Sequence, residues 1–141
     1  MHGMTSALDT LFDLSLARTL IAREVDHPLS QHGLSLSDLA LMRELRLAGG
    51  RLRRSELAAN LGITPSGVAR QVAPLERRGL VDRESNERDA RLALGVLTET
   101  GAGIVDDALR TAEDAAERAF AARWSAPDRE RLAKLLTAAR D

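Results

Sequence analysis

The chain has 141 residues, of which 44% are hydrophobic and 29% charged, and these proportions are typical of a soluble globular protein with one packed core. It has no cysteine, which excludes disulfides, thiol redox sensing and zinc sites built on thiolates. The formal net charge is only −1, but nine arginines against six acidic residues give residues 51–91 a charge of +3 between acidic ends, an asymmetry that suits a polyanion-binding centre.

Two further features of the composition bound the class of protein. Aromatic residues are only 2%, so the core must be built from Leu, Ala, Val and Ile, the mix expected of packed helices. No apolar run approaches the roughly 20 residues that a membrane-spanning helix needs, and the start MHGMTSALDT lacks the basic-then-apolar order of a signal peptide. We therefore expect a cytoplasmic protein with no membrane partner.

The first predicted element is a helix from about Ser6 to Val25. Apolar side chains recur there every four residues, and further ones widen the stripe: Leu8, Phe12, Leu16 and Leu20, then Leu11, Leu14, Ile21 and Val25. His27-Pro28 is expected to end or bend the helix, because a proline inside a helix loses a hydrogen bond and clashes with the preceding turn. The stripe is wider than one domain needs on one helix, which favours a second subunit on one side.

Three short elements follow. Ser37-Asp38 is predicted to open a helix that Gly49-Gly50 ends, with inward side chains at Leu39, Met42, Leu45 and Leu47. The segment RLRR, residues 51–54, is long enough only for a brief strand. Ser55 has the residue type of an N-cap and is predicted to start a short helix that ends at Gly62.

A second short helix is predicted from Thr64 to Gly79. Thr64 is expected as its N-cap and Pro65 as its first helical residue, where the missing N–H costs nothing; the buried stripe is Val68, Val72 and Leu75. Pro74 lies inside this helix and should kink its third turn. Two short helices joined by a tight glycine-containing turn have the order of a helix-turn-helix.

The remaining pattern predicts a hairpin and two helices. LVDRES and LALGV alternate as strands, with Leu92, Leu94 and Val96 on one face, and NERDAR joins them at the tip. Thr98 is predicted to cap a long alanine-rich helix to Arg123, and Ser125 to start a last helix with a capping-box pattern. The predicted fold class is mainly α with a small β-hairpin wing: a winged helix-turn-helix plus a helical region suited to dimerisation.

The chain resembles MarR-family transcriptional regulators over nearly its whole length. The resemblance rests on SELAANLGITPSGVARQVAPLERRGLVDRE followed by RDARLALGVLTETG, which carries the Asp-x-Arg and Leu-Thr-x-x-Gly of the family's wing: Asp89, Arg91, Leu97, Thr98 and Gly101. Asn86-Glu87 departs from the Asp-Pro of many members, which leaves the turn before the wing open.

This resemblance implies both an assembly and an activity. The assembly is a homodimer formed by residues 1–34 and 99–141, with residues 35–98 as the winged-helix DNA-binding region of one compact domain. The activity is that of a ligand-responsive repressor on a pseudo-palindromic operator in double-stranded DNA. Many members of the family release DNA when a small phenolic or anionic effector binds.

Within such a motif, the second helix carries the residues expected to meet DNA. Its N-terminal residues approach the base edges in the major groove, and the small residues Ser66 and Gly67, next to Thr64, let its backbone amides approach phosphate. Arg70 can pair with guanine and Gln71 with adenine, each bidentate pair giving about 1–3 kcal/mol of discrimination. On an isolated helix both would be ordinary solvated residues; the surrounding motif favours DNA contact.

Charges on either side of this helix supply further candidates. Arg54 and Ser55 could contact backbone phosphates at its flank. At the hairpin tip, Arg91 is expected to enter the minor groove, whose narrow A·T-rich segments attract arginine. Asp89 would hold the Arg91 guanidinium in one orientation, and Arg88 would contact phosphate or the groove. The alternative is a surface ion pair worth about 0–1 kcal/mol and without function.

Other kinds of function find less support in the sequence. No Ser/His/Asp or Cys/His arrangement suggests an enzyme, and there is no glycine-rich phosphate loop or cofactor motif. The spacing of His27 and His32 matches no common metal-ligand pattern, although either could line an effector pocket. A winged helix acting as a protein-interaction module remains the main alternative. A helical dimer that binds a small molecule without regulating DNA would leave the wing unexplained.

Overall fold

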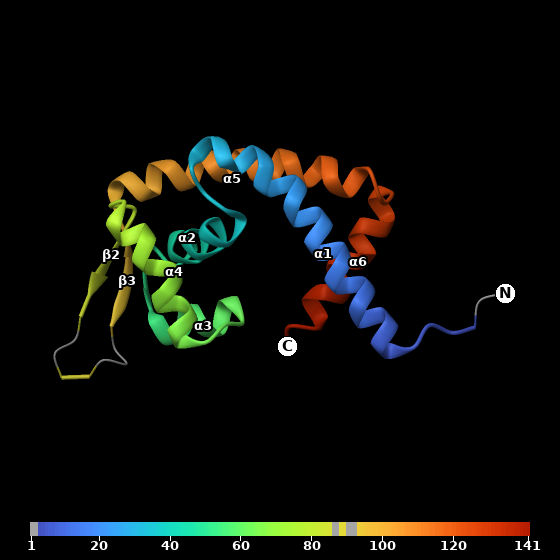
Figure 1. Cartoon of the computed structure of the whole chain (residues 1–141), viewed down its shortest axis with the longest axis horizontal. Coiled ribbons are helices and arrows are strands. Elements are labelled where there is room, and N and C mark those ends of the chain that lie inside the picture. Colours follow the sequence, from blue (N-terminus) through green and yellow to red (C-terminus); the bar gives the residue numbers. More distant parts are fainter. Residues whose placement is uncertain (1–2, 86–87, 90–92) are drawn as a thin grey trace.

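A computed structural model describes residues 3–85, 88–89 and 93–141 of the chain (Figure 1). In chain order the elements are α1 (Ala7–Leu29), η1 (Ser30–His32), α2 (Leu36–Leu47), β1 (Arg51–Arg53), α3 (Arg54–Leu61), α4 (Pro65–Arg77), β2 (Val81–Glu84), β3 (Leu94–Leu97), α5 (Glu99–Ala121) and α6 (Ala126–Ala138). The predicted fold class, mainly α with a small wing, is confirmed.

The long helix α5 connects the two ends of the molecule (Figure 1). Its first turns lie over the strands, with α2, α3 and α4 grouped beside them, and α1 packs along its later turns. After α5, the chain turns back into α6, which crosses near α1 in the view of Figure 1. The helix-turn-helix and its wing therefore lie at one end of α5, and the first and last helices lie towards the other.

One apolar core runs through most of these elements. Its largest fully buried side chains come from α1 to α5: Leu29, Leu41, Met42, Leu45, Leu57, Val68, Val72, Leu75, Val81 and Val105. On α5 the buried face is mostly alanine, at Ala108, Ala112 and Ala115, which allows α1 to approach closely. The inward face predicted for α4 is therefore confirmed, whereas Leu47, predicted to point inward at the end of α2, is exposed.

The three strands form one antiparallel sheet in the order β1-β3-β2. Arg51 pairs with Val96, and Val81 with Leu97. On β3 the buried residue is Gly95, while Leu94 and Val96 are half-buried. A Cβ at Gly95 would lie 3.2 Å from Leu57 Cδ1, so the absent side chain lets β3 pack directly on α3.

Several predicted helix ends differ from the structure. Ser55 is not an N-cap: Arg53 holds the extended conformation before α3, and the Arg54 amide donates to Ala93 O at 3.1 Å. The start of α3 is therefore set by the pairing of β1 with β3, and Ser55 lies inside its first turn. Helix α2 begins after Ser35, whose hydroxyl accepts from the Asp38 amide in a capping box.

The other boundary shifts involve the two long helices. Helix α1 runs through Pro28 and ends at Leu29, four residues beyond the predicted end at Val25. Helix α5 ends at Ala121 instead of Arg123. The predicted caps Thr64, Thr98 and Ser125 are confirmed, since each hydroxyl accepts from the amide three residues later.

Large apolar side chains remain exposed on α1 and α6. On α1, Phe12 is 61% exposed and Leu16 59%, with Leu8, Leu11, Leu14 and Leu20 also exposed; on α6, Leu135 is 70% exposed. Soluble monomers rarely leave so many large apolar side chains exposed along one helix, so this surface favours a partner. In the described part of the chain, no helix combines the length and apolar character that crossing a membrane requires.

Candidate nucleic-acid interface

The N-terminus of α4 is built as an anion-binding end. Thr64 caps it with its hydroxyl 3.0 Å from the Gly67 amide, and Pro65 occupies the first turn. A Cβ at Gly67 would lie 3.2 Å from Thr64 Oγ1, so a larger residue would crowd the cap. Ser66 is exposed. Pro65 has no amide hydrogen, and the amides of Gly67 and Val68 donate to Thr64. The Ser66 amide is therefore the one left in this turn to favour negative charge, together with the positive end of the helix dipole.

One face of α4 is exposed along its whole length. It carries Ser66, Arg70, Pro74 and Arg77, spaced by three or four residues, while Val68, Val72 and Leu75 fill the opposite face. Arg70 makes no hydrogen bond or ion pair with any described residue. Its guanidinium is therefore available to a ligand.

Pro74 and Arg77 also lie on this exposed face of α4. Pro74 cannot donate to Arg70 O, but since it faces solvent, water can satisfy that carbonyl, and α4 continues to Arg77 as one element. Arg77, in the last turn of α4, shares the exposed surface of Arg70. The spacing of seven residues, two helical turns, is a signal from which the sequence could have placed it there.

Gln71 faces away from the exposed surface and has a partner within the protein. Its side chain is half-buried, and Nε2 donates to Ser37 O at 2.6 Å. An amide reading adenine directs both its N–H and its C=O at the base. The bond to Ser37 O therefore competes with adenine for the Gln71 N–H donor. Nothing in the sequence indicates this bond.

Arg54 and Glu76 form a partly buried charge pair beside α4. Their side chains are 20% and 25% exposed, with Arg54 Nη2 3.4 Å from Glu76 Oε1. Arg83 of β2 lies at the same distance from the same oxygen, with its Nε facing it. Burial lowers the pKa of the Arg54 guanidinium and the charge of Arg83 lowers it further, whereas Glu76 raises it. One carboxylate thus joins the start of α3, the recognition helix and the wing strand.

We expect Glu76→Gln to lower the free energy of unfolding by about 1–3 kcal/mol, because two neighbouring guanidinium groups would lose their shared anion. The measurement is urea denaturation followed by circular dichroism. Glu84→Gln is the matched control, since Glu84 pairs with Arg51 at 3.0 Å in solvent and should cost less than about 1 kcal/mol. Equal losses in the two variants would mean that the shared carboxylate has no special role.

The wing candidates are described only in part. Asn86, Glu87 and Arg91 lie outside the described residues, so the entry of Arg91 into a minor groove stays a prediction. Arg88 is exposed and Asp89 half-buried, between the ends of β2 and β3. Ser55 is exposed on the first turn of α3, next to Arg54. The orienting role of Asp89 also stays a prediction.

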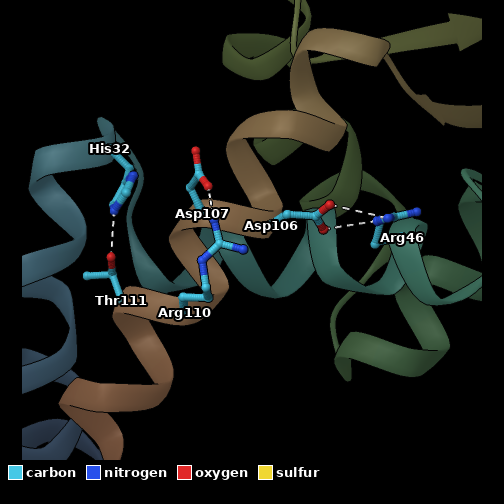
Figure 2. A network of polar contacts seen from close by, with 6 residues as sticks. All are labelled: His32, Arg46, Asp106, Asp107, Arg110 and Thr111. Atoms are coloured by element: carbon cyan, nitrogen blue, oxygen red, sulfur yellow. Dashed lines mark hydrogen bonds and ion pairs between the residues drawn. The ribbon is translucent and has the colours of Figure 1, made fainter.

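Polar contacts hold α5 against the helix-turn-helix end (Figure 2). Arg46 of α2 donates to both oxygens of Asp106, at 3.1 and 3.2 Å, and this hydrogen bonding lowers the pKa of the Asp106 carboxyl. Further along α5, Thr111 Oγ1 lies 2.7 Å from His32 Nε2, in the connection between α1 and α2. These pairs are 60 and 79 residues apart in sequence, so no local pattern predicts them.

His32, a candidate for lining an effector pocket, is thus part of this contact. In residues 3–85, 88–89 and 93–141, no three His, Asp or Glu side chains gather into a group that could hold a metal ion.

Sequence comparison places the central part of the chain in a known family. Residues 32–92 match the MarR family. A Mycobacterium leprae protein named an uncharacterized HTH-type transcriptional regulator is 32% identical over 102 residues, which are 72% of this chain and 71% of that protein.

Two solved structures resemble the chain over nearly its whole length. CouR from Rhodococcus jostii, solved with p-coumaroyl-CoA bound, has 26% identity, a TM-score of 0.80 and coverage of 96% of both chains. A mutant of MarR from E. coli, solved with operator DNA, has 20% identity and a TM-score of 0.79, covering 96% of this chain and 99% of its own. The fold is therefore that of winged-helix regulators.

Proposed function

Because the chain belongs to the MarR family of transcriptional regulators, we propose that it is a cytoplasmic, homodimeric repressor of transcription. It binds a pseudo-palindromic operator in double-stranded DNA. The observation that carries this proposal is the exposed face of α4. It combines a capped N-terminus, at which the Ser66 amide is left for an anion, with Arg70, which has no partner among the described residues. Such a helix can lie in a major groove with phosphate at its start and a base edge at its first full turn.

The contacts divide into two kinds. Thr64, Ser66 and Gly67 position the helix through backbone and hydroxyl groups on phosphate, which carries no sequence information. Arg70 reads a base, and guanine is the partner that its paired N–H groups fit. The similarity to MarR from E. coli, solved with operator DNA, supports a DNA partner for the same fold.

The flanking contacts lie on α3 and the wing. Arg54 and Ser55 approach phosphate at the start of α3, although the Arg54 guanidinium also forms an ion pair with Glu76. On the wing, Arg91 enters the minor groove with Asp89 orienting it, and Arg88 contacts the backbone or the groove.

The dimer follows from the exposed apolar residues of α1 and α6. Residues 1–34 and 99–141 form the interface, and residues 35–98 present one DNA-binding unit per subunit. Two units related by a two-fold axis match two half-sites about one helical turn apart.

The effector is a small phenolic or anionic molecule. CouR, which is 26% identical, has been solved with p-coumaroyl-CoA, a ligand that is both phenolic and anionic. Effector binding releases the repressor from DNA, which requires a higher effector affinity for the released form.

The test is selection from a pool of random duplex DNA by the purified protein over a series of salt concentrations. Enrichment of an inverted repeat supports a dimeric sequence reader. A steep salt slope without an enriched sequence would leave only backbone attraction. Absence of binding at low salt would favour the protein-interaction alternative.

We expect Arg70→Ala to relax sequence preference at one position of each half-site, by about 1–3 kcal/mol of discrimination, because its bidentate contact with a base is lost. The measurement is the same selection, followed by titration of the enriched duplex and its single-base variants. Arg118→Ala is the control: it removes the same charge from an exposed position of α5 and should leave the preference unchanged. A uniform loss over all sequences would make Arg70 a phosphate contact instead.

A further inference from the structure

The short segment Gly33–Ser37, between α1 and α2, receives two side chains from α4. Arg78, the residue that caps the C-terminus of α4, donates from Nη1 to Gly33 O at 2.7 Å. Gln71 donates from Nε2 to Ser37 O at 2.6 Å. Both acceptors are backbone carbonyls, so their positions do not depend on a side-chain rotamer.

The same segment is also bonded to the long helices. From α1, Asp26 Oδ1 accepts from the Leu36 amide at 2.6 Å. From α5, Thr111 bonds to His32, the residue just before Gly33 (Figure 2). Helices α1, α4 and α5 therefore all make polar contacts with residues 32–37, which we call the bracket.

The two bonds from α4 define the direction of the helix axis. Gln71 and Arg78 are seven residues apart, or about 10 Å along the helix. Packing of Val68, Val72 and Leu75 on the core restricts the angle of α4 only to within about 15–20°, because ridges and grooves of packed helices tolerate that much scatter. Hydrogen bonds at two separated points restrict both sliding and rotation of the helix, since their strength falls steeply with distance and angle.

We propose that Gln71 and Arg78 are positioning residues that set the angle of α4 against α1 and α5 through the bracket, and that Gln71 does not read a base. This inference rests on the proposed DNA-binding function and deepens it. If α1 and α5 hold the two subunits together, the bracket carries the geometry of the dimer to the helix that enters the groove. Reading a base requires the side chain to be held within about 0.5 Å of its productive position.

The first test measures the position of α4 without DNA. The chain has no cysteine, so Ser66→Cys on α4 and Glu113→Cys on α5 provide the only sites for two nitroxide labels. Labelled protein diluted with unlabelled protein reports the distance within one subunit by pulsed electron spin resonance. Gln71→Met combined with Arg78→Ala should shift or broaden the distance distribution, and Arg77→Ala should leave it unchanged. An unchanged distribution in the double variant would overturn the proposal.

The second test separates positioning from base reading, using the unlabelled chain in the DNA selection. Gln71→Met keeps the length of the side chain and removes its donor. We expect it to enrich the same sequence as the parent protein with about fivefold weaker affinity, the effect of one net hydrogen bond. A new preferred base at one position of each half-site would make Gln71 a reader and overturn the proposal.

Arg78 supplies the rescue. Arg78→Ala should weaken binding by about five- to tenfold across sequences. Arg78→Lys retains a donor for Gly33 O, so it should restore most of the lost affinity and narrow the distance distribution again. If Arg78 acted only through its charge, Arg78→Lys would restore the affinity fully and leave the distance distribution unchanged.

Failure of the inference differs from failure of the proposed function. If the parent protein enriches no sequence, the DNA-binding proposal fails, while the distance measurement still decides whether the bracket positions α4. If the parent enriches an operator and the distances do not respond, only the positioning role is lost.

Discussion

Gly101→Ala should lower the free energy of unfolding by more than about 3 kcal/mol, among the larger effects of a single substitution. Gly101 is buried in the first turn of α5. A Cβ there would lie 2.0 Å from Leu80 O and 3.0 Å from Leu80 C. Those are backbone atoms that cannot rotate away, so α5 and the turn between α4 and β2 would have to separate.

The surroundings of Gly101 make that separation costly. Thr98 Oγ1 accepts from the Gly101 amide and lies 2.7 Å from Gly79 O and 3.0 Å from Leu80 O. One hydroxyl thus caps α5 and bonds the turn that follows the recognition helix. The Leu-Thr-x-x-Gly pattern at residues 97–101 has a physical basis here, because the threonine makes the contact and the glycine leaves room for it.

Gly103→Ala is the matched control, in the same helix with nothing within 4 Å of an added Cβ. It should raise the free energy of unfolding by roughly 0.5–1 kcal/mol, since alanine favours the helix over glycine. Thermal and urea denaturation of both variants check the pair. A Gly101→Ala protein as stable as the parent would show that α5 can shift without loss.

The second large effect is expected for the Phe12→Glu/Leu16→Glu variant, which should be monomeric at concentrations where the parent is a dimer. Phe12 and Leu16 are 61% and 59% exposed in the single chain. Burying each in an interface contributes about 1.5–3 kcal/mol, and each occurs twice in a two-fold dimer. The dissociation constant should therefore rise by at least about a thousandfold.

Light scattering during size-exclusion chromatography and sedimentation equilibrium measure this change. Arg43→Glu, at an exposed position of α2, alters the net charge by the same two units without touching the stripe and should remain dimeric. The monomeric variant should bind the full operator about as weakly as an isolated half-site, because it no longer engages two half-sites at once. A parent protein that is monomeric at tens of micromolar, or a variant that stays dimeric, would remove this interface from the proposed function.

The helix-turn-helix was the part of the fold most open to prediction from the sequence. Thr64 and Pro65 mark the start of α4 and Gly62 the end of α3 through local backbone chemistry, which depends only on neighbouring residues. The alternation of the wing strands and the recurrence of apolar residues every three or four positions in the helices are local in the same sense. The exposed face that carries Ser66 and Arg70 also follows directly from helical periodicity.

The prediction of Ser55 as a cap was wrong for a reason that lies outside its own segment. An N-cap needs an extended backbone before the helix, and that conformation falls on Arg53 because β1 pairs with β3, more than 40 residues away. Gln71 shows the same limit for the site. In the sequence it is adjacent to Arg70, but its donor is bonded to Ser37 O.

By itself, then, the sequence determined the order of the elements, the caps of most helices, the family and which face of α4 is exposed. Tertiary structure decided which charges are shared, as with Arg54, Glu76 and Arg83, and how closely α5 approaches the turn at Leu80. It also decided that Gln71 bonds to the bracket. The physical reason is range: caps, turns and periodicity act within about one or two helical turns, whereas hydrogen bonds and packing between elements depend on how distant segments meet.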